Sequence, residues 1–568
     1  MRARHHRARV LGYTPAPTAA RASAGERERA MRIQAVGAAL FVNVVALGCG
    51  GGGGDRDPEP GPPRVFSVTV SGLEGSGFDV WNGHGHLWVP GNGTFTFEQQ
   101  IDDGARYDLE IGSSTSPIPS GVIRCTAGAA ATGVATADVN VPITCTTIAV
   151  FTAVFGGDRE LWATDGSRSW RVANINPGGS SNPEGMTALN GRVYFTADDG
   201  AHGVELWMTD GRGAYLVRDI VWESALGSYP GEPLVVFRGE LYFAADDPYW
   251  PRRALWKTDG TWEGTVELKS VHEVAWPREF GVIGEGLEQE LYFSGWTEAE
   301  GLELWRSDGT ASGTVFVADV CPGTCDSGPG DFVELGGWVY FIARCEDRAD
   351  RLWRTDGTTT ELVTGYGDAR AYSPTRFGDE IYFEVMSGTE SRLWKTDGTA
   401  EGTRMVTTPD MLDGFRYPSL FGVLDGTLFF QTDDGTSLSV WKIAEGETAP
   451  VLVKSSMLEE TWYCFGPTVP FTPYHGEVYF KGTDSTHGCE LWKSDGTEGG
   501  TTMLADLNPD GDGAAFDLTI VNGRLLFGAR ASGTTPEPGA RLWATDGSAA
   551  GTSVIADVKF CGFTGAGC

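Results

Sequence analysis

The sequence predicts an all-β protein, in which a β-propeller of eight or nine four-stranded blades follows a small β-sandwich. Three observations support this fold class. A Leu-Trp or Val-Trp step recurs nine times, copies are 41 to 51 residues apart, and glycine-containing turn pairs separate the apolar runs. A period of that length is typical of a propeller blade and is much longer than one coil of a β-helix.

The repeated tryptophan marks the third strand of each predicted blade. Its nine positions are Trp162, Trp207, Trp256, Trp305, Trp353, Trp394, Trp441, Trp492 and Trp543. An Asp-Gly pair follows eight of them, and Glu445-Gly446 takes its place after Trp441. A motif that returns nine times points to architecture, because a catalytic motif is needed only once.

Each unit offers four strands, as in MTAL (186–189), VYFTA (193–197), ELWMT (205–209) and YLVRDI (215–220). Glycine in the intervening Asn-Gly and Asp-Gly pairs accepts the positive φ that tight hairpins require. Neighbouring apolar residues such as Leu491 and Trp492 point to opposite faces of a strand, so both faces must be covered. Sheets stacked around an axis cover both faces, and we expect these residues to fill the space between blades.

These phrases resemble the ELWxxDGT repeat family of bacterial exported proteins, and their strand order is similar to that of kelch blades. The resemblance covers about residues 148–558 and implies a repeat scaffold; it does not imply a catalytic residue or a known ligand. The first unit begins without an innermost strand, and the last ends at residue 558. Closing the ring must therefore borrow or forgo a strand.

A secretory signal precedes the folded part. Residues 33–47 form an apolar stretch that follows one arginine and is too short to span a bilayer comfortably. The phrase 46–49, Ala-Leu-Gly-Cys, resembles the lipobox of bacterial lipoproteins, which implies that Cys49 carries the lipid anchor. We expect a signal region at 1–48, with 1–30 either an over-extended start or a long n-region, and an exported protein anchored at the bacterial outer membrane or cell surface.

The remaining domain boundaries follow from composition. Residues 49–65 are rich in glycine and proline and predict a tether, because such a segment cannot bury apolar surface. Residues 66–147 hold seven short alternating segments, which predict a small Ig-like antiparallel sandwich. The propeller then occupies 148–560, and residues 561–568 form a C-terminal tail.

Cysteines in an exported protein predict disulfides. Cys125 and Cys145 lie on the last two strands of the sandwich, and Cys464 and Cys489 lie in two loops expected on one face of a blade. Cys321 and Cys325, together with Cys345, repeat that arrangement with one thiol left over. In the tail, Cys561 and Cys568 form a further candidate pair. The C-x₃-C spacing of CPGTC favours a structural bridge over redox or zinc chemistry.

The stretch DLNPDGDGAAFD (506–517) resembles a calcium loop of the EF-hand or dockerin kind, which needs alternating oxygen ligands and a sharp turn. Its candidate Ca²⁺ ligands are Asp506, Asn508, Asp510, Asp512 and Asp517. An ordinary blade connection is the alternative, because Pro509 is unusual in such a loop and NINPGG (174–179) repeats part of the phrase. No other cofactor is predicted.

Charge and motifs narrow the function classes. The formal net charge of −33 disfavours nucleic acid and favours cations or cationic partners. The alternative is that the charge only keeps the protein soluble. The sequence has no HExxH, G-x-S-x-G, P-loop or Rossmann fingerprint. We therefore predict a cell-surface lipoprotein whose propeller is a non-enzymatic binding scaffold for an extracellular protein, glycan or matrix. The alternative is a propeller hydrolase or lyase acting on extracellular polysaccharide.

Overall fold

The computed structural model describes residues 61–563 except 115, 117, 223–226, 232, 248–249, 271, 346–348, 389, 407–415, 434–436, 459–469, 485 and 533–538. Across these residues the protein is all-β, as predicted; its single helical element is the 3₁₀ turn η1 (Gly286–Glu288). Within the same residues no helix is long and apolar enough to cross a membrane.

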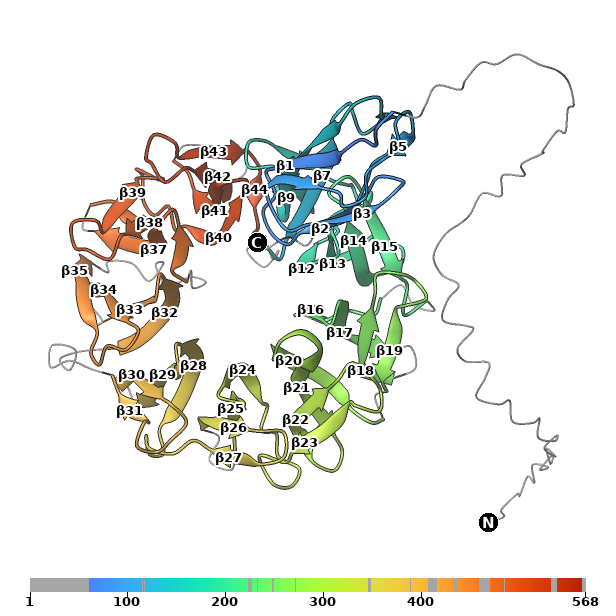
Figure 1. Cartoon of the computed structure of the whole chain (residues 1–568). Coiled ribbons are helices and arrows are strands. Elements are labelled where there is room, and N and C mark those ends of the chain that lie inside the picture. The colour runs from blue at the N-terminus through green and yellow to red at the C-terminus, as the bar shows by residue number, and fades with distance from the viewer. Residues whose placement is uncertain are drawn as a thin grey trace, which may run out of the picture. The chain divides into compact units, whose positions relative to one another are not determined.

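Eight four-stranded antiparallel sheets follow one another around a propeller-like ring (Figure 1). The first four consist of β12 (Glu184–Leu189), β13 (Arg192–Asp198), β14 (Val204–Thr209) and β15 (Ala214–Arg218); β16 (Val235–Phe237), β17 (Glu240–Asp247), β18 (Trp250–Thr258) and β19 (Val266–Lys269); β20 (Ala275–Ile283), β21 (Glu290–Thr297), β22 (Gly301–Ser307) and β23 (Val315–Ala318); β24 (Gly330–Leu335), β25 (Trp338–Arg344), β26 (Asp350–Thr355) and β27 (Thr360–Leu362).

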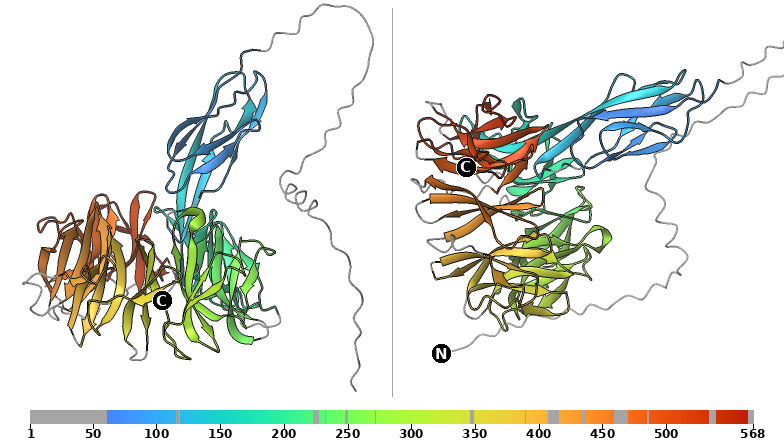
Figure 2. Two further views of the ribbon diagram at one scale, coloured as in Figure 1. Left: turned by 60° about the horizontal axis from the view of Figure 1, so that its bottom comes forward. Right: turned by 60° about the vertical axis from the view of Figure 1, so that its left-hand side comes forward.

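The other four sheets repeat the same strand order. They consist of β28 (Arg370–Phe377), β29 (Glu380–Ser387), β30 (Glu390–Thr396) and β31 (Arg404–Met405); β32 (Arg416–Leu424), β33 (Thr427–Asp433), β34 (Ser437–Ala444) and β35 (Val451–Leu458); β36 (Thr472–Tyr474), β37 (Glu477–Asp484), β38 (Gly488–Ser494) and β39 (Thr502–Ala505); β40 (Phe516–Val521), β41 (Arg524–Arg530), β42 (Ala540–Thr545) and β43 (Ser553–Ala556). First strands such as β12, β20 and β24 lie toward the centre of the ring (Figure 1), and the strands run between its two faces (Figure 2).

A long strand joins the two ends of the ring. This strand, β9 (Val139–Phe155), pairs with β10 (Asp158–Thr164) on one side and with β44 (Lys559–Phe560) on the other. The outermost strand of the same sheet is β11 (Ser169–Arg171). The unit that lacks an innermost strand in the sequence thus borrows one from the end of the chain, which is one of the two outcomes expected.

The sandwich shares β9 with the ring. The first half of β9 pairs with β1 (Phe66–Ser71) and β7 (Gly121–Ala127), and β1 pairs in turn with β4 (Gly93–Thr96). A second sheet has the order β3 (His86–Val89), β2 (Phe78–Trp81) and β6 (Glu110–Ile111), and β5 (Arg106–Asp108) pairs with β8 (Thr132–Val134). One hydrophobic cluster fills the space between these sheets, and Cys125 and Cys145 form the predicted disulfide.

The Leu-Trp step packs as the alternation of strand side chains requires. Leu491 packs in a cluster with Leu525 and Phe527 of the following sheet, whereas Trp492 packs in a cluster with Phe429 and Val440 of the preceding sheet. The predicted role of this step between blades is therefore confirmed for the sheet β36–β39.

The Asp-Gly-Thr phrase that follows Trp492 forms a turn. In the sheet β36–β39, Asp495 Oδ1 accepts hydrogen bonds from the backbone N–H and the hydroxyl of Thr497, at 2.8 and 2.7 Å. Gly496 has a φ of +85°, which a residue with a Cβ adopts at a cost. The predicted turn is therefore confirmed.

Candidate functional site

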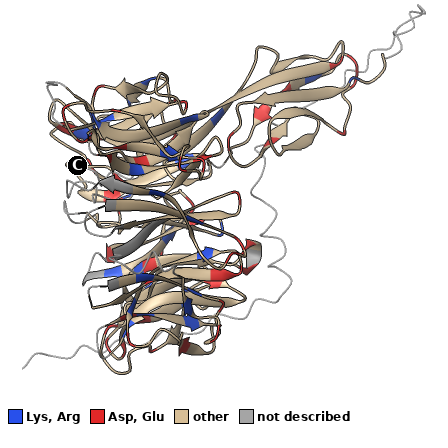
Figure 3. Ribbon diagram, turned by 90° about the vertical axis from the view of Figure 1, so that its left-hand side faces the viewer, with Lys and Arg blue, Asp and Glu red and all other residues tan. Residues whose placement is uncertain are grey.

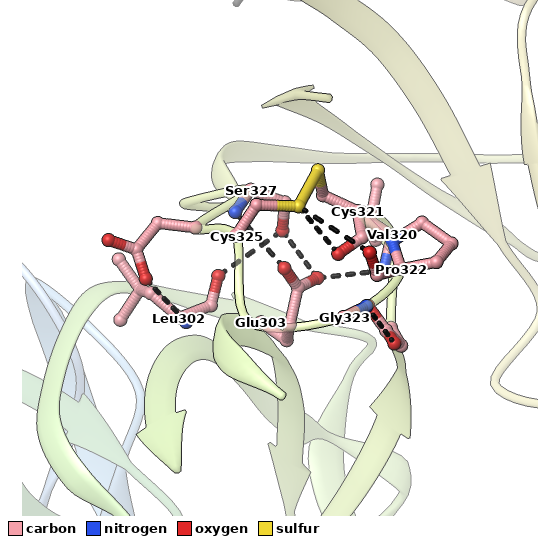
Figure 4. The surroundings of a disulfide bond; sticks show 10 residues. Leu302, Glu303, Val320, Cys321, Pro322, Gly323, Cys325 and Ser327 are labelled. Atoms are coloured by element: carbon pink, nitrogen blue, oxygen red, sulfur yellow. Dashed lines mark hydrogen bonds between the residues drawn. A yellow bond between two sulfur atoms is a disulfide. The ribbon is translucent and has the colours of Figure 1, made fainter. Parts of the chain in front are cut away.

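A buried glutamate precedes the Leu-Trp step in four of the sheets. Each of these residues is 0% exposed: Glu160, Glu205, Glu303 and Glu490. In the sheet β20–β23, Glu303 accepts hydrogen bonds from the backbone N–H of Val320 at 2.7 Å and from the N–H and hydroxyl of Ser327 at 3.0 and 2.6 Å (Figure 4). The carboxylate thereby ties the loop that leaves β23 to the loop that enters β24.

Burial changes the acidity of these glutamates. Loss of water around the carboxyl group raises the pKa of Glu205, Glu303 and Glu490 to about 7, although the hydrogen bonds that they accept act in the opposite direction. Burial likewise raises the pKa of Glu160. Because the same arrangement occurs in four sheets, we assign these glutamates to the architecture of the ring.

A disulfide adds a second constraint to the loop beside Glu303. Cys321 and Cys325 are bonded to each other (Figure 4), and Cys345 is a free thiol. The sequence predicted a structural bridge here, and that part is confirmed. The predicted pairing across two loops through Cys345 is wrong, because the two cysteines of CPGTC close a small ring within one loop. The loop 320–327 is thus held at both of its ends.

This loop forms one wall of a pocket of about 540 Å³. The lining residues come from the inner strands β20, β24 and β28, from β22, β25 and β26, and from the end of the held loop and the residues after it: Arg278, Glu279, Leu302, Asp326, Gly328, Gly330, Asp331, Ile342, Arg344, Asp350 and Tyr372. Because the first strands face the centre of the ring (Figure 1), the pocket lies at the inner rim.

Bulges place two acidic residues on neighbouring inner strands. The register of β20 shifts between Arg278 and Gly281, where Glu279 has a φ of +55°. That of β24 shifts between Gly330 and Val333, where Asp331 has a φ of +54°. A bulge re-aims the side chain at the extra residue. The bulge itself belongs to the repeat, since β28 and β40 carry it as well.

The charges that line the pocket are only partly paired. Arg344 forms an ion pair with Asp350, with 3.1 Å between Nε and Oδ1, and Asp326 Oδ1 accepts the backbone N–H of Leu302 at 2.9 Å. Within the described part of the chain, the side chains of Arg278, Glu279 and Asp331 form no hydrogen bond or ion pair.

Asp331 is exposed as a whole residue. Even so, the partial loss of water around its carboxyl group raises its pKa. One cation and two anions therefore face the pocket without a protein partner.

The predicted calcium ligands do not converge. Asp512 Oδ1 accepts the backbone N–H of Cys489 at 2.9 Å, Asn508 donates its amide to the carbonyl of Asp512, and Asp517 Oδ2 accepts the backbone N–H of Phe563. Among the described residues, no group of three or more His, Cys, Asp or Glu side chains could hold a metal ion. The loop has the geometry of a blade connection, so the calcium site stays a prediction that this geometry does not support.

The other predicted site residues lie outside the pocket. Cys49, Cys464 and Cys568 fall outside the described residues. Cys489 and Cys561, their predicted partners in two of the pairs, are each disulfide-bonded. The repeat tryptophans are buried or half-buried between sheets. None of them lines the 540 Å³ pocket.

Sequence reasoning missed both the buried glutamates and the pocket. The glutamates had a signal, because Glu-Leu-Trp recurs together with a serine two residues before a proline, as in Ser181, Ser228 and Ser327. The pocket residues had none, since they lie up to 94 residues apart, from Arg278 to Tyr372, and share no motif.

Comparisons with known proteins show no relative by sequence. No family model matches the chain, and no curated protein matches it. Solved structures that resemble it include a puromycin-hydrolysing peptidase from Mycobacterium tuberculosis (12% identity, TM-score 0.33, covering 58% of this chain and 52% of that one) and a puromycin hydrolase (13%, 0.34, 64% and 60%). Prolyl oligopeptidase B from Galerina marginata is another (12%, 0.38, 62% and 56%).

The names of these neighbours differ from the functional prediction. They are peptidases and hydrolases by name, whereas the sequence predicted a non-enzymatic scaffold for protein, glycan or matrix. None is named for a polysaccharide, which was the substrate class of the alternative prediction. The chain spans only 52 to 60% of the length of these structures. The likeness is one of fold alone and assigns no catalytic residue to this chain.

Proposed function

We propose that the pocket at the inner rim, between the sheets β20–β23 and β24–β27, binds a small dipolar ligand that carries more positive than negative charge. The observation that carries this proposal is the set of three charged side chains, Arg278, Glu279 and Asp331, which face one pocket without partners in the described part of the chain. A ligand with complementary charges supplies the partners that the protein does not.

The balance of charge defines the ligand class. Arg278 suits a carboxylate, because a guanidinium binds that group with two parallel hydrogen bonds. Glu279 and Asp331 suit two ammonium groups. A short peptide with a free amino terminus, a basic side chain and a carboxyl terminus has this pattern. The net charge of −33 on the whole chain favours the approach of such a ligand.

The shape of the site agrees with a small ligand. A volume of about 540 Å³ lies within the usual range for small-molecule pockets. The wall at 326–328 adjoins the loop that Glu303 and the Cys321–Cys325 disulfide hold in place (Figure 4). A wall that is already fixed loses little entropy on binding.

Isothermal titration calorimetry with lysyl-alanine and glutamyl-alanine tests this proposal. We expect lysyl-alanine to bind and glutamyl-alanine to bind at least about tenfold more weakly, because loss of a charge-assisted hydrogen bond costs about 1.5–3 kcal/mol. Asp331→Asn and Arg278→Gln should each weaken lysyl-alanine by a similar factor. Equal binding of the two peptides would overturn the proposal, and alanine release measured in the same mixtures shows whether binding leads to hydrolysis.

The matched control is Arg530→Gln. Arg530 ends β41 as Arg344 ends β25, and each donates its backbone N–H to the loop that enters its own sheet, to Gly513 and Ser327 respectively. Arg530 does not line the pocket. Its substitution should leave the affinity for lysyl-alanine unchanged.

We also propose that the chain is exported and held at a bacterial membrane by a lipid on Cys49. The apolar stretch 33–47 and the phrase 46–49 support this location. Metabolic labelling with radioactive palmitate should mark the protein, and Cys49→Ser should abolish the label and release the chain from membranes. An unlabelled, freely secreted wild-type protein would contradict the anchor.

We infer, finally, that the ring has nine blades. The eight four-stranded sheets supply eight, and β44, β9, β10 and β11 supply the ninth. The support for this count is the pairing of Phe560 with Ala153, which gives β9 an inner neighbour. Cryo-electron microscopy of the purified protein should show nine radial densities.

A further inference from the structure

One face of the sandwich exposes two tryptophans at diagonal positions of two paired strands. Trp81 lies on β2 and Trp88 on β3, and they are 42% and 54% exposed. In the register of these strands Trp81 lies opposite His86, and Trp88 lies opposite Asp79. The alternate residues Phe78 and Val80 are 0% exposed and belong to the core of the sandwich. All four outward residues therefore share one face.

The side chains of this face contact one another and the backbone beneath them. His86 Nε2 lies 3.2 Å from Asp79 Oδ1, so the two polar residues contact each other between the tryptophans. The ring of Trp88 lies over Gly77, where a Cβ would come within 2.7 Å of Cζ2. Glu110 of β6 lies opposite Trp81 and adds a second exposed carboxylate. Two exposed indoles and two carboxylates thus lie on a three-stranded sheet.

We propose that this face docks on the surface of a phospholipid bilayer that contains phosphatidylethanolamine, and this proposal rests on the lipid anchor at Cys49 proposed above. Tryptophan favours the membrane–water interface because its ring is apolar and its N–H is polar. The carboxylates of Asp79 and Glu110 complement the primary ammonium of the phosphatidylethanolamine headgroup. The occupant of the face is thus a lipid surface.

The length of the tether supports this occupant. The described part of the chain begins at Gly61, only 12 residues after Cys49. Twelve residues span at most about 40 Å when fully extended. Because the sandwich begins so few residues after Cys49, a lipid on that residue would keep the sandwich close to a bilayer. Tethering raises the effective concentration, so two indoles suffice for a contact that would be weak in free solution.

Depth-dependent fluorescence quenching tests the docking. The full-length lipidated protein is reconstituted in phosphatidylethanolamine vesicles with and without brominated acyl chains, which quench nearby indoles. We expect bromine to remove part of the tryptophan emission of the wild type. Trp81→Phe combined with Trp88→Phe should abolish that bromine-dependent part. Trp222→Phe, which removes a 66% exposed indole from the ring, should retain it.

Two readouts separate failure of docking from failure of anchoring. If palmitate labels the protein but quenching is the same in the wild type and in the Trp81/Trp88 double variant, the docking proposal is overturned and the anchor stands. If palmitate does not label the protein, the anchor falls, and the docking falls with it. Circular dichroism verifies that the double variant is folded, which is expected because both substitutions keep an aromatic ring on an exposed face.

Discussion

Leu491 and Trp492 are consecutive in β38, yet they belong to two different hydrophobic clusters, one on each side of their sheet. Leu491 is 0% exposed and Trp492 is 6% exposed. One dipeptide therefore packs its own sheet against the sheet before it and the sheet after it. Its repetition along the chain lets successive sheets pack in the same way.

Truncation of Trp492 should weaken the contact with the preceding sheet. Trp492→Ala removes a large buried ring and should lower the free energy of unfolding by about 3–5 kcal/mol. Urea unfolding followed by circular dichroism measures this loss. Trp222→Ala removes an indole that is 66% exposed and should cost less than about 0.5 kcal/mol. Equal losses in the two variants would show that Trp492 does not pack between sheets.

The strand borrowed from the end of the chain should be required for stability. Phe560 is 1% exposed and packs in a cluster with Phe151 and Phe563. Phe560→Ala should therefore cost about 3–5 kcal/mol in a urea titration. Phe155, at the end of β9, is 59% exposed, so Phe155→Ala is the matched control and should leave the free energy of unfolding almost unchanged. An unchanged midpoint for Phe560→Ala would mean that β44 does not close the ring.

The buried glutamates should make stability depend on pH. Burial raises the pKa of Glu205, Glu303 and Glu490 to about 7 in the folded protein, against 4.5 for an ordinary glutamate. The folded state then binds more protons than the unfolded state between these values. Their contribution to stability is complete below about pH 4.5 and is lost as the pH rises through 7.

Thermal unfolding across pH 4.5–8 measures this dependence. Glu303→Gln should reduce the fall in melting temperature over that range, because the amide does not titrate. The variant should also be less stable than the wild type, because the NH₂ group of glutamine would face the donors of Val320 and Ser327. Glu361→Gln changes a half-exposed carboxylate and should leave the slope unchanged. A wild-type melting temperature that does not fall between pH 4.5 and 7 would show that these glutamates titrate normally.

One sheet contains a hydrogen bond that others lack. The indole N–H of Trp441 donates to Thr432 Oγ1 at 2.9 Å. Six other repeat tryptophans have a buried indole N–H without a partner in the described structure: Trp162, Trp207, Trp256, Trp305, Trp353 and Trp492. Thr432 lies two residues after Phe430, which pairs with Trp441. In the sheets of Trp207 and Trp256 the equivalent residues are Ala197 and Ala245, which offer no side-chain acceptor.

Thr432→Val should therefore destabilise the protein by about 1–2 kcal/mol, because it removes an acceptor of the buried indole N–H while it keeps the side-chain shape. A double-mutant cycle in urea identifies the cause. In a Trp441→Phe background, Thr432→Val should cost almost nothing. The same cost in both backgrounds would assign the effect to the packing of Thr432.

The repeat could be predicted from the sequence because its signals are local. The Leu-Trp alternation and the turn at Asp495-Gly496 each follow from a few consecutive residues. The structure does not support the calcium prediction at 506–517, because a linear pattern does not show which backbone N–H groups will donate to the carboxylate oxygens. In the folded chain, Asp512 and Asp517 accept backbone N–H groups of Cys489 and Phe563, which come from other parts of the chain.

The pocket shows the other limit of sequence reasoning. Arg278 and Asp331 line one pocket only because β20 and β24 are neighbouring inner strands, and each lies at or beside a bulge that the hydrophobic pattern does not show. In the side view of Figure 3, acidic and basic residues are interspersed over the ring. Charge alone therefore did not distinguish Arg278 and Asp331 from the other charged residues.

The closing strand has a consequence for biogenesis. A polypeptide is synthesised from its amino terminus, and β44 follows every other described strand of the ring. The inner edge of β9 therefore stays unpaired until residues 559–560 have emerged, and an unpaired edge is where chains aggregate or are recognised as incomplete. A chain that ends before residue 559 would therefore keep an unpaired strand edge in its ring.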